Sequence, residues 1–258
     1  MQKIKIKEIL EIAKYAGDIA MDFYDKKYIT NQKENETPVT EADIAINDYL
    51  IKELEKYNHP ILSEEVKDDF KRRKSAELVW IIDPLDGTAD FIQKTGEFSI
   101  MIGLINKKGE SILGVVYAPA LGEIYWAEKG KGAFFASSNE NIDKWLKKTK
   151  QIQISEKKFQ NGKILVSRNH LGEYEQEIAK KYNMIQIPAG SAGLKICWIA
   201  RGNAELYINS SNKSGVWDIC AGDIILTEAG GKITDKNQNK ILYNKKEIML
   251  LNGYIASN

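Results

Sequence analysis

The spacing of hydrophobic positions predicts helices at the start of the chain and strands after them. Residues 4–27 place apolar side chains at three- and four-residue steps, as an amphipathic helix does. A polar stretch at 30–38 follows, which we interpret as a mobile loop, and Thr40 then begins a second amphipathic helix. Short apolar runs that end in acids or prolines predict buried strands. They lie at 60–62, 78–82, 98–105, 111–117 and 124–127.

Strands and helices alternate in the second half of the chain. The pattern predicts strands at 163–167, 184–187, 204–208 and 248–251, and helices at 173–182, 194–200 and 218–229. The intervening residues 137–162 are polar and rich in lysine, which is typical of a domain boundary with a solvated face. We therefore predict an α+β protein with an N-terminal α+β half at 1–160 and a C-terminal α/β half at 161–258.

The composition narrows the class of protein. The chain has 258 residues, which is enough for one or two domains with a real core. Its 37 basic and 36 acidic side chains give a net charge of +1, which argues against a dedicated partner of nucleic acid polymers or anionic membranes. The two cysteines, Cys197 and Cys220, predict reduced core thiols and a cytoplasmic location. No apolar run approaches the ~18 residues of a membrane helix, and the first residues lack the apolar core of a secretion signal.

One predicted strand runs directly into a pair of aspartates. Asp83 and Asp86 follow the apolar run, with Pro84 between them and Gly87 behind them. Pro84 restricts the backbone and Gly87 permits a tight turn, so both carboxylates can point into one small space. Such close carboxylates repel each other, and a hard cation such as Mg²⁺ relieves the repulsion. Free N–H groups after Gly87 would face an anion, so we predict a metal and phosphate site. The alternative is an ordinary turn.

Three other acidic positions are candidates for the same site. Glu64 and Glu65 follow the strand at 60–62, and at most one of them faces the site because successive strand residues point to opposite faces. The alternative is a surface pair. Asp218 begins the last predicted helix, where it would also complement the helix dipole. Asp223 lies about 140° around that helix and cannot reach the same metal.

Asp43 has a local explanation in the sequence. Thr40-Glu41-Ala42-Asp43 matches the capping box, in which the residue three positions after the cap bonds back to it. This pattern alone favours a structural role for Asp43.

Together these motifs resemble the lithium-sensitive, magnesium-dependent phosphomonoesterases, the inositol monophosphatase and fructose-1,6-bisphosphatase superfamily. The resemblance runs from about residue 9 to the end and rests on four segments in order: Ser63-Glu64-Glu65, Asp83-Pro84-Leu85-Asp86-Gly87-Thr88, Trp217-Asp218 and Glu228-Ala229-Gly230-Gly231. It implies a layered αβαβα sugar-phosphatase fold, with N-terminal helices and an antiparallel sheet in one half and a mixed sheet in the other.

Within this superfamily the chain is most similar to the CysQ-type 3′(2′),5′-bisphosphate nucleotidases. The similar segments are residues 60–65, 96–99, 114–119, 167–170 and 190–195. The last of them is rich in glycine and has one residue more than some members carry. The resemblance implies a phosphatase that converts 3′-phosphoadenosine 5′-phosphate to AMP and phosphate by metal-activated water and is inhibited by Li⁺.

The resemblance also implies two or three Mg²⁺ ions per active site. Glu64, Asp83 and the backbone carbonyl of Leu85 would hold one ion, and Asp83, Asp86 and Asp218 would hold a second. With this implication, Asp43 acquires a second role, because the helix cap uses one carboxylate oxygen and leaves the other available.

Roles near the reacting phosphate follow from the same resemblance. Asp86 and the amides of Gly87 and Thr88 would contact the scissile phosphate. The Thr88 hydroxyl, with Glu64 or Asp43 nearby, would orient the attacking water.

The substrate side is implied in the same way. Arg168 and Lys195 would meet the second phosphate, and His170 would lie against the sugar or the adenine. Without the resemblance, these three are an ordinary surface arginine, helix lysine and exposed histidine. Ser167, Gly190 and Asp218 complete the implied substrate-binding set. Asp90 and Glu97 are expected to have only local roles.

Two other functions stay open. One is an inositol monophosphatase or sugar-phosphate phosphatase with the same metal site, and the other is a catalytically silent, metal-binding regulatory protein. We expect a small-molecule nucleotide substrate, no nucleic acid polymer, no transmembrane segment, and a monomer or homodimer.

Overall fold

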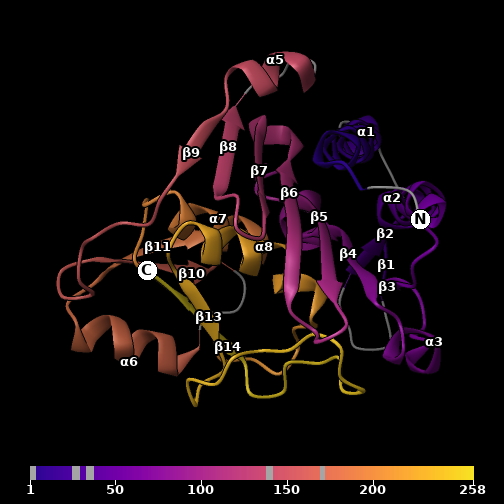
Figure 1. Cartoon of the computed structure of the whole chain (residues 1–258). Coiled ribbons are helices and arrows are strands. Elements are labelled where there is room, and N and C mark those ends of the chain that lie inside the picture. Colours follow the sequence, from indigo (N-terminus) through magenta and orange to yellow (C-terminus); the bar gives the residue numbers. More distant parts are fainter. Residues whose placement is uncertain (1–3, 25–29, 33–37, 138–141, 169–171) are drawn as a thin grey trace.

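The structure is a computed structural model, and it describes residues 4–24, 30–32, 38–137, 142–168 and 172–258 (Figure 1). The helices are α1 (Ile6–Tyr24), α2 (Glu41–Leu54), α3 (Phe70–Lys74), α4 (Thr88–Ile92), α5 (Ile142–Lys147), α6 (Glu173–Lys181), α7 (Ala192–Ala200) and α8 (Trp217–Glu228). Two short 3-10 turns, Glu55–Tyr57 and Pro119–Leu121, accompany them.

The strands form a two-stranded ribbon and two larger sheets. The ribbon pairs β1 (Thr30–Gln32) with β2 (Pro38–Thr40). The seven-stranded sheet follows chain order: β3 (Ile61–Ser63), β4 (Leu78–Asp86), β5 (Ser99–Asn106), β6 (Ser111–Ala118), β7 (Glu123–Glu128), β8 (Ala133–Ser137) and β9 (Lys150–Ile152). The five-stranded sheet has the order β11 (Ile185–Ala189), β10 (Lys163–Ser167), β12 (Leu206–Asn209), β14 (Tyr254–Ser257), β13 (Lys232–Thr234).

These elements stack in five layers. Helices α1 and α2 cover one face of the seven-stranded sheet, α7 and α8 lie between the two sheets, and α6 covers the outer face of the five-stranded sheet (Figure 1). The first sheet is antiparallel except for the parallel pair β3–β4, and the second is mixed. The layered αβαβα architecture expected from the sequence is confirmed.

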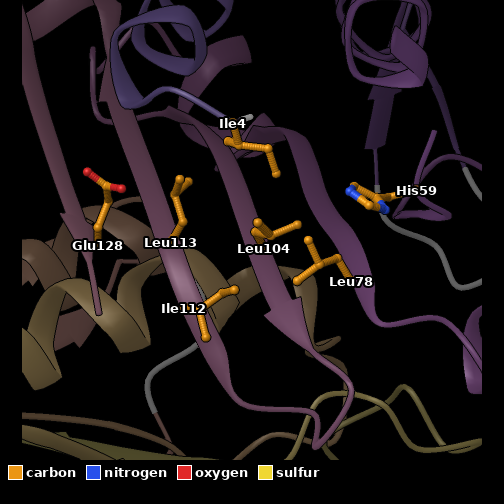
Figure 2. Close-up of a pocket in the computed structure, with 7 residues that line it drawn as sticks. All are labelled: Ile4, His59, Leu78, Leu104, Ile112, Leu113 and Glu128. Atoms are coloured by element: carbon orange, nitrogen blue, oxygen red, sulfur yellow. The ribbon is translucent and has the colours of Figure 1, made fainter. Parts of the chain in front are cut away.

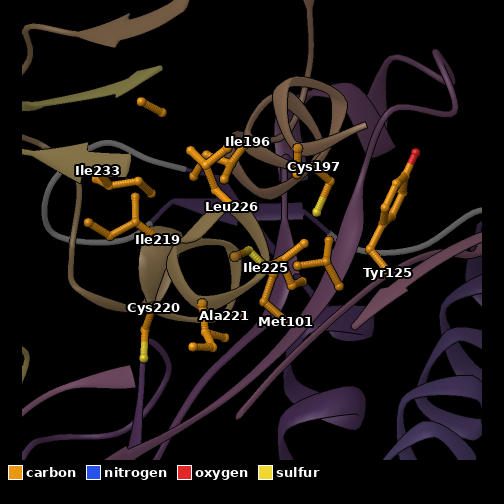
Figure 3. Close-up of a cluster of buried hydrophobic side chains, with 14 of the residues drawn as sticks. Met101, Tyr125, Ile196, Cys197, Ile219, Cys220, Ala221, Ile225, Leu226 and Ile233 are labelled. Carbon is orange, nitrogen blue, oxygen red and sulfur yellow. The ribbon is translucent and has the colours of Figure 1, made fainter. Parts of the chain in front are cut away.

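Helix α8 packs closely against the first sheet because β6 has a glycine beneath it. A Cβ at Gly114 would lie 2.2 Å from the carbonyl oxygen of Ala221, so any larger residue would displace the helix. Cys220 and Cys197 are free thiols in the core between the layers, as predicted (Figure 3). This packing determines where the N-terminus of α8, and with it Asp218, meets the sheet.

Two expectations about local structure are wrong, those for residues 30–38 and 248–251. The polar stretch at 30–38 carries strand residues at both of its described ends, because backbone pairing needs no apolar periodicity. The polar region 137–162, whose role as a domain boundary stays a prediction, contains α5 and β9 among its described residues, and β9 extends the first sheet. Residues 248–251 form only an isolated bridge from Met249 to Gly215, and the sheet instead uses β13 and β14.

Candidate functional site

The site begins where β4 ends. The pairing of β4 with β5 shifts register between Asp83 and Asp86, so this segment leaves the regular ladder. Gly87 then adopts φ 91°, a left-handed conformation that favours glycine, and α4 starts at Thr88. A Cβ at Gly87 would lie 3.0 Å from the Glu97 carbonyl oxygen, so the turn is also confined by its neighbour. The predicted tight turn after the second aspartate is therefore present.

Three carboxylates from different elements converge beside this turn. Glu64, Asp83 and Asp218 each offer an oxygen, and the three oxygens lie within 4.8 Å of one another. The parallel pair β3–β4 brings Glu64 next to β4, and its amide donates to the carbonyl oxygen of Ile82. Asp218 arrives from the first turn of α8. The arrangement offers hard oxygen ligands on one side of a small space, which is the chemistry that Mg²⁺ prefers.

The electrostatics of this group favour a bound cation. Burial, together with the charges of Glu64 and Asp86, raises the pKa of Asp218 well above its usual value. Its Oδ2 also accepts a hydrogen bond from the amide of Gly215 at 2.8 Å, which acts in the opposite direction. A buried carboxylate next to other carboxylates is difficult to ionise. A bound metal ion would stabilise its charged form, because the positive charge offsets the repulsion.

Asp43 divides its two oxygens between two tasks. Its Oδ2 accepts from the amide and hydroxyl of Thr40, at 2.7 and 2.6 Å, and closes the predicted capping box of α2. Its Oδ1 lies 3.0 Å from the hydroxyl of Thr88, and that hydroxyl is also 3.1 Å from the carbonyl oxygen of Leu85. Burial raises the pKa of Asp43. The buried carboxylate is therefore a proton acceptor next to Thr88.

Asp86 differs from the three converging carboxylates in its hydrogen-bond partners. Among the residues that the structure describes, it is not a member of the group within 4.8 Å. It bonds to the start of α7 instead: its oxygens accept from the amides of Ala192 and Gly193, at 3.1 and 2.8 Å, and from the hydroxyl of Ser191. Its implied role as a metal ligand stays a prediction.

The predicted basic residues of the substrate side differ in their surroundings. Lys195 is buried, and its ammonium donates to the carbonyl oxygens of Ala189 and Gly190, at 3.2 and 3.1 Å. Burial lowers its pKa to about 8. Arg168 lies just beyond Ser167 at the end of β10 and forms ion pairs with two carboxylates.

One predicted residue cannot be placed, and several contacts were not foreseen. His170 lies outside the described residues. Asp90 and Glu97, expected to be local, are the partners of Arg168 from the other half of the chain, so that expectation is wrong. No periodicity links positions about seventy or eighty residues apart. Ser99 and Ser191, whose hydroxyls lie 3.0 Å apart beside Asp86, were missed for the same reason.

A cavity of about 290 Å³ lies elsewhere on the first sheet (Figure 2). Its lining is mainly apolar and includes Leu78, Leu104 and Leu113, with His59 and Glu128 at its sides. Burial lowers the pKa of His59, which favours the neutral ring. None of the residues that form the acidic site lines this cavity. Among the described residues, we also find no helix with the length and apolar content to cross a bilayer.

Comparison with known proteins agrees with this geometry. The model of the inositol monophosphatase family matches residues 4–258. A protein named 3′(2′),5′-bisphosphate nucleotidase CysQ from Aggregatibacter actinomycetemcomitans is 34% identical, over 94% of this chain and 88% of its own. A protein of the same name from Salmonella typhimurium is 32% identical, over 96% of this chain and 98% of its own.

A solved structure supports the same relationship. CysQ from Bacteroides thetaiotaomicron, described as a bacterial member of the inositol monophosphatase family, superposes with a TM-score of 0.82 at 28% identity. The match covers 97% of this chain and 95% of that one. Sequence motifs, layered fold and converging carboxylates thus agree, and the chain belongs to the inositol monophosphatase family.

Proposed function

We propose that this protein is a Mg²⁺-dependent phosphomonoesterase that hydrolyses 3′-phosphoadenosine 5′-phosphate to AMP and phosphate. The observation that carries the proposal is the convergence of Glu64, Asp83 and Asp218 beside the Gly87 turn. The names of the two relatives, both bisphosphate nucleotidases, support the choice of substrate.

In this proposal the acidic residues hold two or three Mg²⁺ ions. Glu64, Asp83 and the Leu85 carbonyl serve one ion, and Asp83 with Asp86 and Asp218 serves a second. When bound, the ions supply positive charge beside the attacking water and the leaving oxygen of an in-line displacement. The donor set fits, because it consists of hard oxygens, and burial together with the charges of Glu64 and Asp86 already raises the pKa of Asp218.

The chain's own residues orient the water and accept its proton. The Thr88 hydroxyl donates its proton towards Asp43 Oδ1, 3.0 Å away, so a lone pair on the Thr88 oxygen is available to the water. The raised pKa of Asp43 makes it a better base than an exposed carboxylate. Thr40 holds the second oxygen of Asp43 and thereby orients the group. Glu64, directly after β3, is the second candidate for orienting the water.

The remaining contacts serve the phosphates and the nucleoside. Asp86 and the amides of Gly87 and Thr88 border the scissile phosphate in this proposal, where the backbone N–H groups stabilise developing charge. Lys195 is the proposed partner of the second phosphate, since a buried ammonium makes strong charge-assisted bonds. Ser167, His170, Gly190 and Asp218 complete the proposed substrate side.

The first experiment measures phosphate release from 3′-phosphoadenosine 5′-phosphate and from inositol 1-phosphate, side by side, with Mg²⁺ and with chelator. We expect preference for the nucleotide, loss of activity in chelator and inhibition by Li⁺ at low millimolar concentration. Preference for inositol phosphate would support the proposed metal site but would show that the substrate is not the nucleotide. Mg²⁺ binding without turnover of any phosphomonoester would instead support the silent regulatory protein.

A further inference from the structure

Arg168 is bound by two carboxylates from the other half of the chain. Its two terminal nitrogens donate to Asp90 Oδ1 and, at 2.8 Å, to Glu97 Oε2. The Asp90 side chain is only 4% exposed, while those of Arg168 and Glu97 are 30% and 21% exposed. The planar guanidinium is suited to two acceptors at once. The three side chains therefore form an ion cluster that joins the end of β10 to helix α4, which carries Asp90, and to the segment between α4 and β5, which carries Glu97.

The same cluster encloses the turn that leads into α7. Glu97 Oε2 also accepts from the amide of Gly190 at 2.6 Å, and the amide of Arg168 donates to the carbonyl oxygen of Ala189 at 3.2 Å. A Cβ at Gly190 would lie 2.5 Å from Asp90 Cγ, so the turn and the cluster are in close contact. Movement of the Arg168 cluster would therefore move this turn.

The Gly190–Ser191 turn also contacts Asp86 and Gly87, which border the scissile phosphate in the proposed function. Ser191 follows Gly190 directly, and its hydroxyl donates to Asp86. Its amide nitrogen lies 3.2 Å from where a Cβ of Gly87 would be. A continuous series of direct contacts thus runs from Arg168 through Gly190 and Ser191 to Asp86 and Gly87.

These contacts conflict with the role in phosphate binding that the family resemblance implies for Arg168. A substrate phosphate on this guanidinium would compete with both carboxylates, and would weaken the ion pair of the buried Asp90. We propose that Arg168 is instead a positioning residue, which ties the Gly190–Ser191 turn to the α4–β5 segment and so holds Asp86 and Gly87 in place. The inference rests on the proposed function for the phosphate-side role of Asp86 and Gly87 and for the choice of assay substrate.

The two roles predict opposite behaviour for a series of variants. Arg168→Met should lower kcat about ten-fold or more, because misplacement of catalytic groups slows the reaction, and should change KM by less than about three-fold. Arg168→Lys should not restore kcat, since a point charge cannot bridge two carboxylates. Asp90→Asn and Glu97→Ala should lower kcat in the same direction, and combining either with Arg168→Met should add little further loss.

A phosphate contact would give the reverse pattern. Arg168→Met would then raise KM for the bisphosphate with kcat retained, Arg168→Lys would stay close to wild type, and removal of the competing Asp90 or Glu97 charge would lower KM. That pattern, or wild-type kinetics in every variant, would overturn the proposal. Where Arg168→Met fails to fold, as judged by circular dichroism, Arg168→Lys and Asp90→Asn decide the question.

Arg201 provides a matched control at the opposite end of α7. Its guanidinium pairs with Glu123 at 3.1 Å, also between the two halves, and its side chain is 35% exposed. Arg201→Met should leave kcat and KM close to wild type. The whole series can be repeated on whichever phosphomonoester the wild type prefers, so a different substrate would refute the proposed function without affecting the test of Arg168.

Discussion

Two groups of carboxylates lie close to the Gly87 turn, and the fold surrounds them differently. In the metal-side group, Glu64, Asp83 and Asp218, carboxylates face one another, and burial together with the charges of Glu64 and Asp86 raises the pKa of Asp218.

The junction group consists of Asp86, Asp90 and Glu97, which accept hydrogen bonds from amides, hydroxyls and the Arg168 guanidinium. Carboxylates of the same charge thus have different effects in the two groups, because their neighbours differ. Carboxylates that face one another favour a cation from solution, whereas carboxylates that face donors join two parts of the chain.

The largest effect should come from removing one metal-side charge. Asp83→Asn should lower kcat by about 10³-fold or more, because a metal contributes several kcal/mol of charge stabilisation. In chelator, the variant should melt no lower than wild type, since it also removes a repulsive charge. Steady-state assays at saturating Mg²⁺ and thermal melts with chelator check both points. Retained turnover would show that Asp83 is not a ligand.

Thr88 tests the proposed orientation of the attacking water next to the metal-side group. Thr88→Val keeps the shape of the side chain and removes the hydroxyl 3.0 Å from Asp43, and we expect kcat to fall by about 10²-fold. Thr88→Ser is the matched control and should keep most of the activity. Equal loss in both variants would indicate that the methyl packing, rather than the hydroxyl, is what matters.

The junction group should affect stability as well as activity. Gly190→Ala places a methyl group 2.5 Å from Asp90 Cγ, so the turn must move or the ion cluster must open. We expect a loss of about 2 kcal/mol in the free energy of unfolding, the usual cost of overpacking. Urea denaturation measures it, and an unchanged midpoint would mean that the turn relaxes freely.

Asp223, on α8 beyond Asp218, should have the smallest effect on activity, and it should change the pH dependence of stability instead. Burial raises its pKa to about 6, and Tyr243 donates to it at 2.8 Å. Between about pH 4 and pH 6 the unfolded state releases this proton before the native state does, so its contribution to stability falls as pH rises.

Asp223→Asn should remove roughly 2 kcal/mol of that pH dependence. Urea midpoints of wild type and variant, measured from pH 4 to 7, should therefore diverge across this window. Parallel curves would contradict the raised pKa.

Sequence patterns predicted elements whose signal is local. The helix that begins at Thr40 was predicted from a capping box, and the structure has both of its hydrogen bonds. Strands β5 and β6 were predicted from two apolar runs, and the structure pairs them as antiparallel neighbours. By contrast, β13 and β14 escaped prediction because they are short and antiparallel partners, and pairing rather than periodicity makes them strands.

Local patterns predicted most helices and strands of this α+β protein, the tight turn after Asp86 and the acidic residues beside it, because each depends on neighbours within a few positions. The layered fold was expected from the family resemblance of the motifs. The tertiary structure, and no local pattern, determines which acidic side chains face one another. It brought Asp218 to Glu64 and Asp83, and it directed Asp86 to the start of α7. It also joined Arg168 to Asp90 and Glu97. Contacts between distant segments depend on how whole layers pack, and no local spacing encodes them.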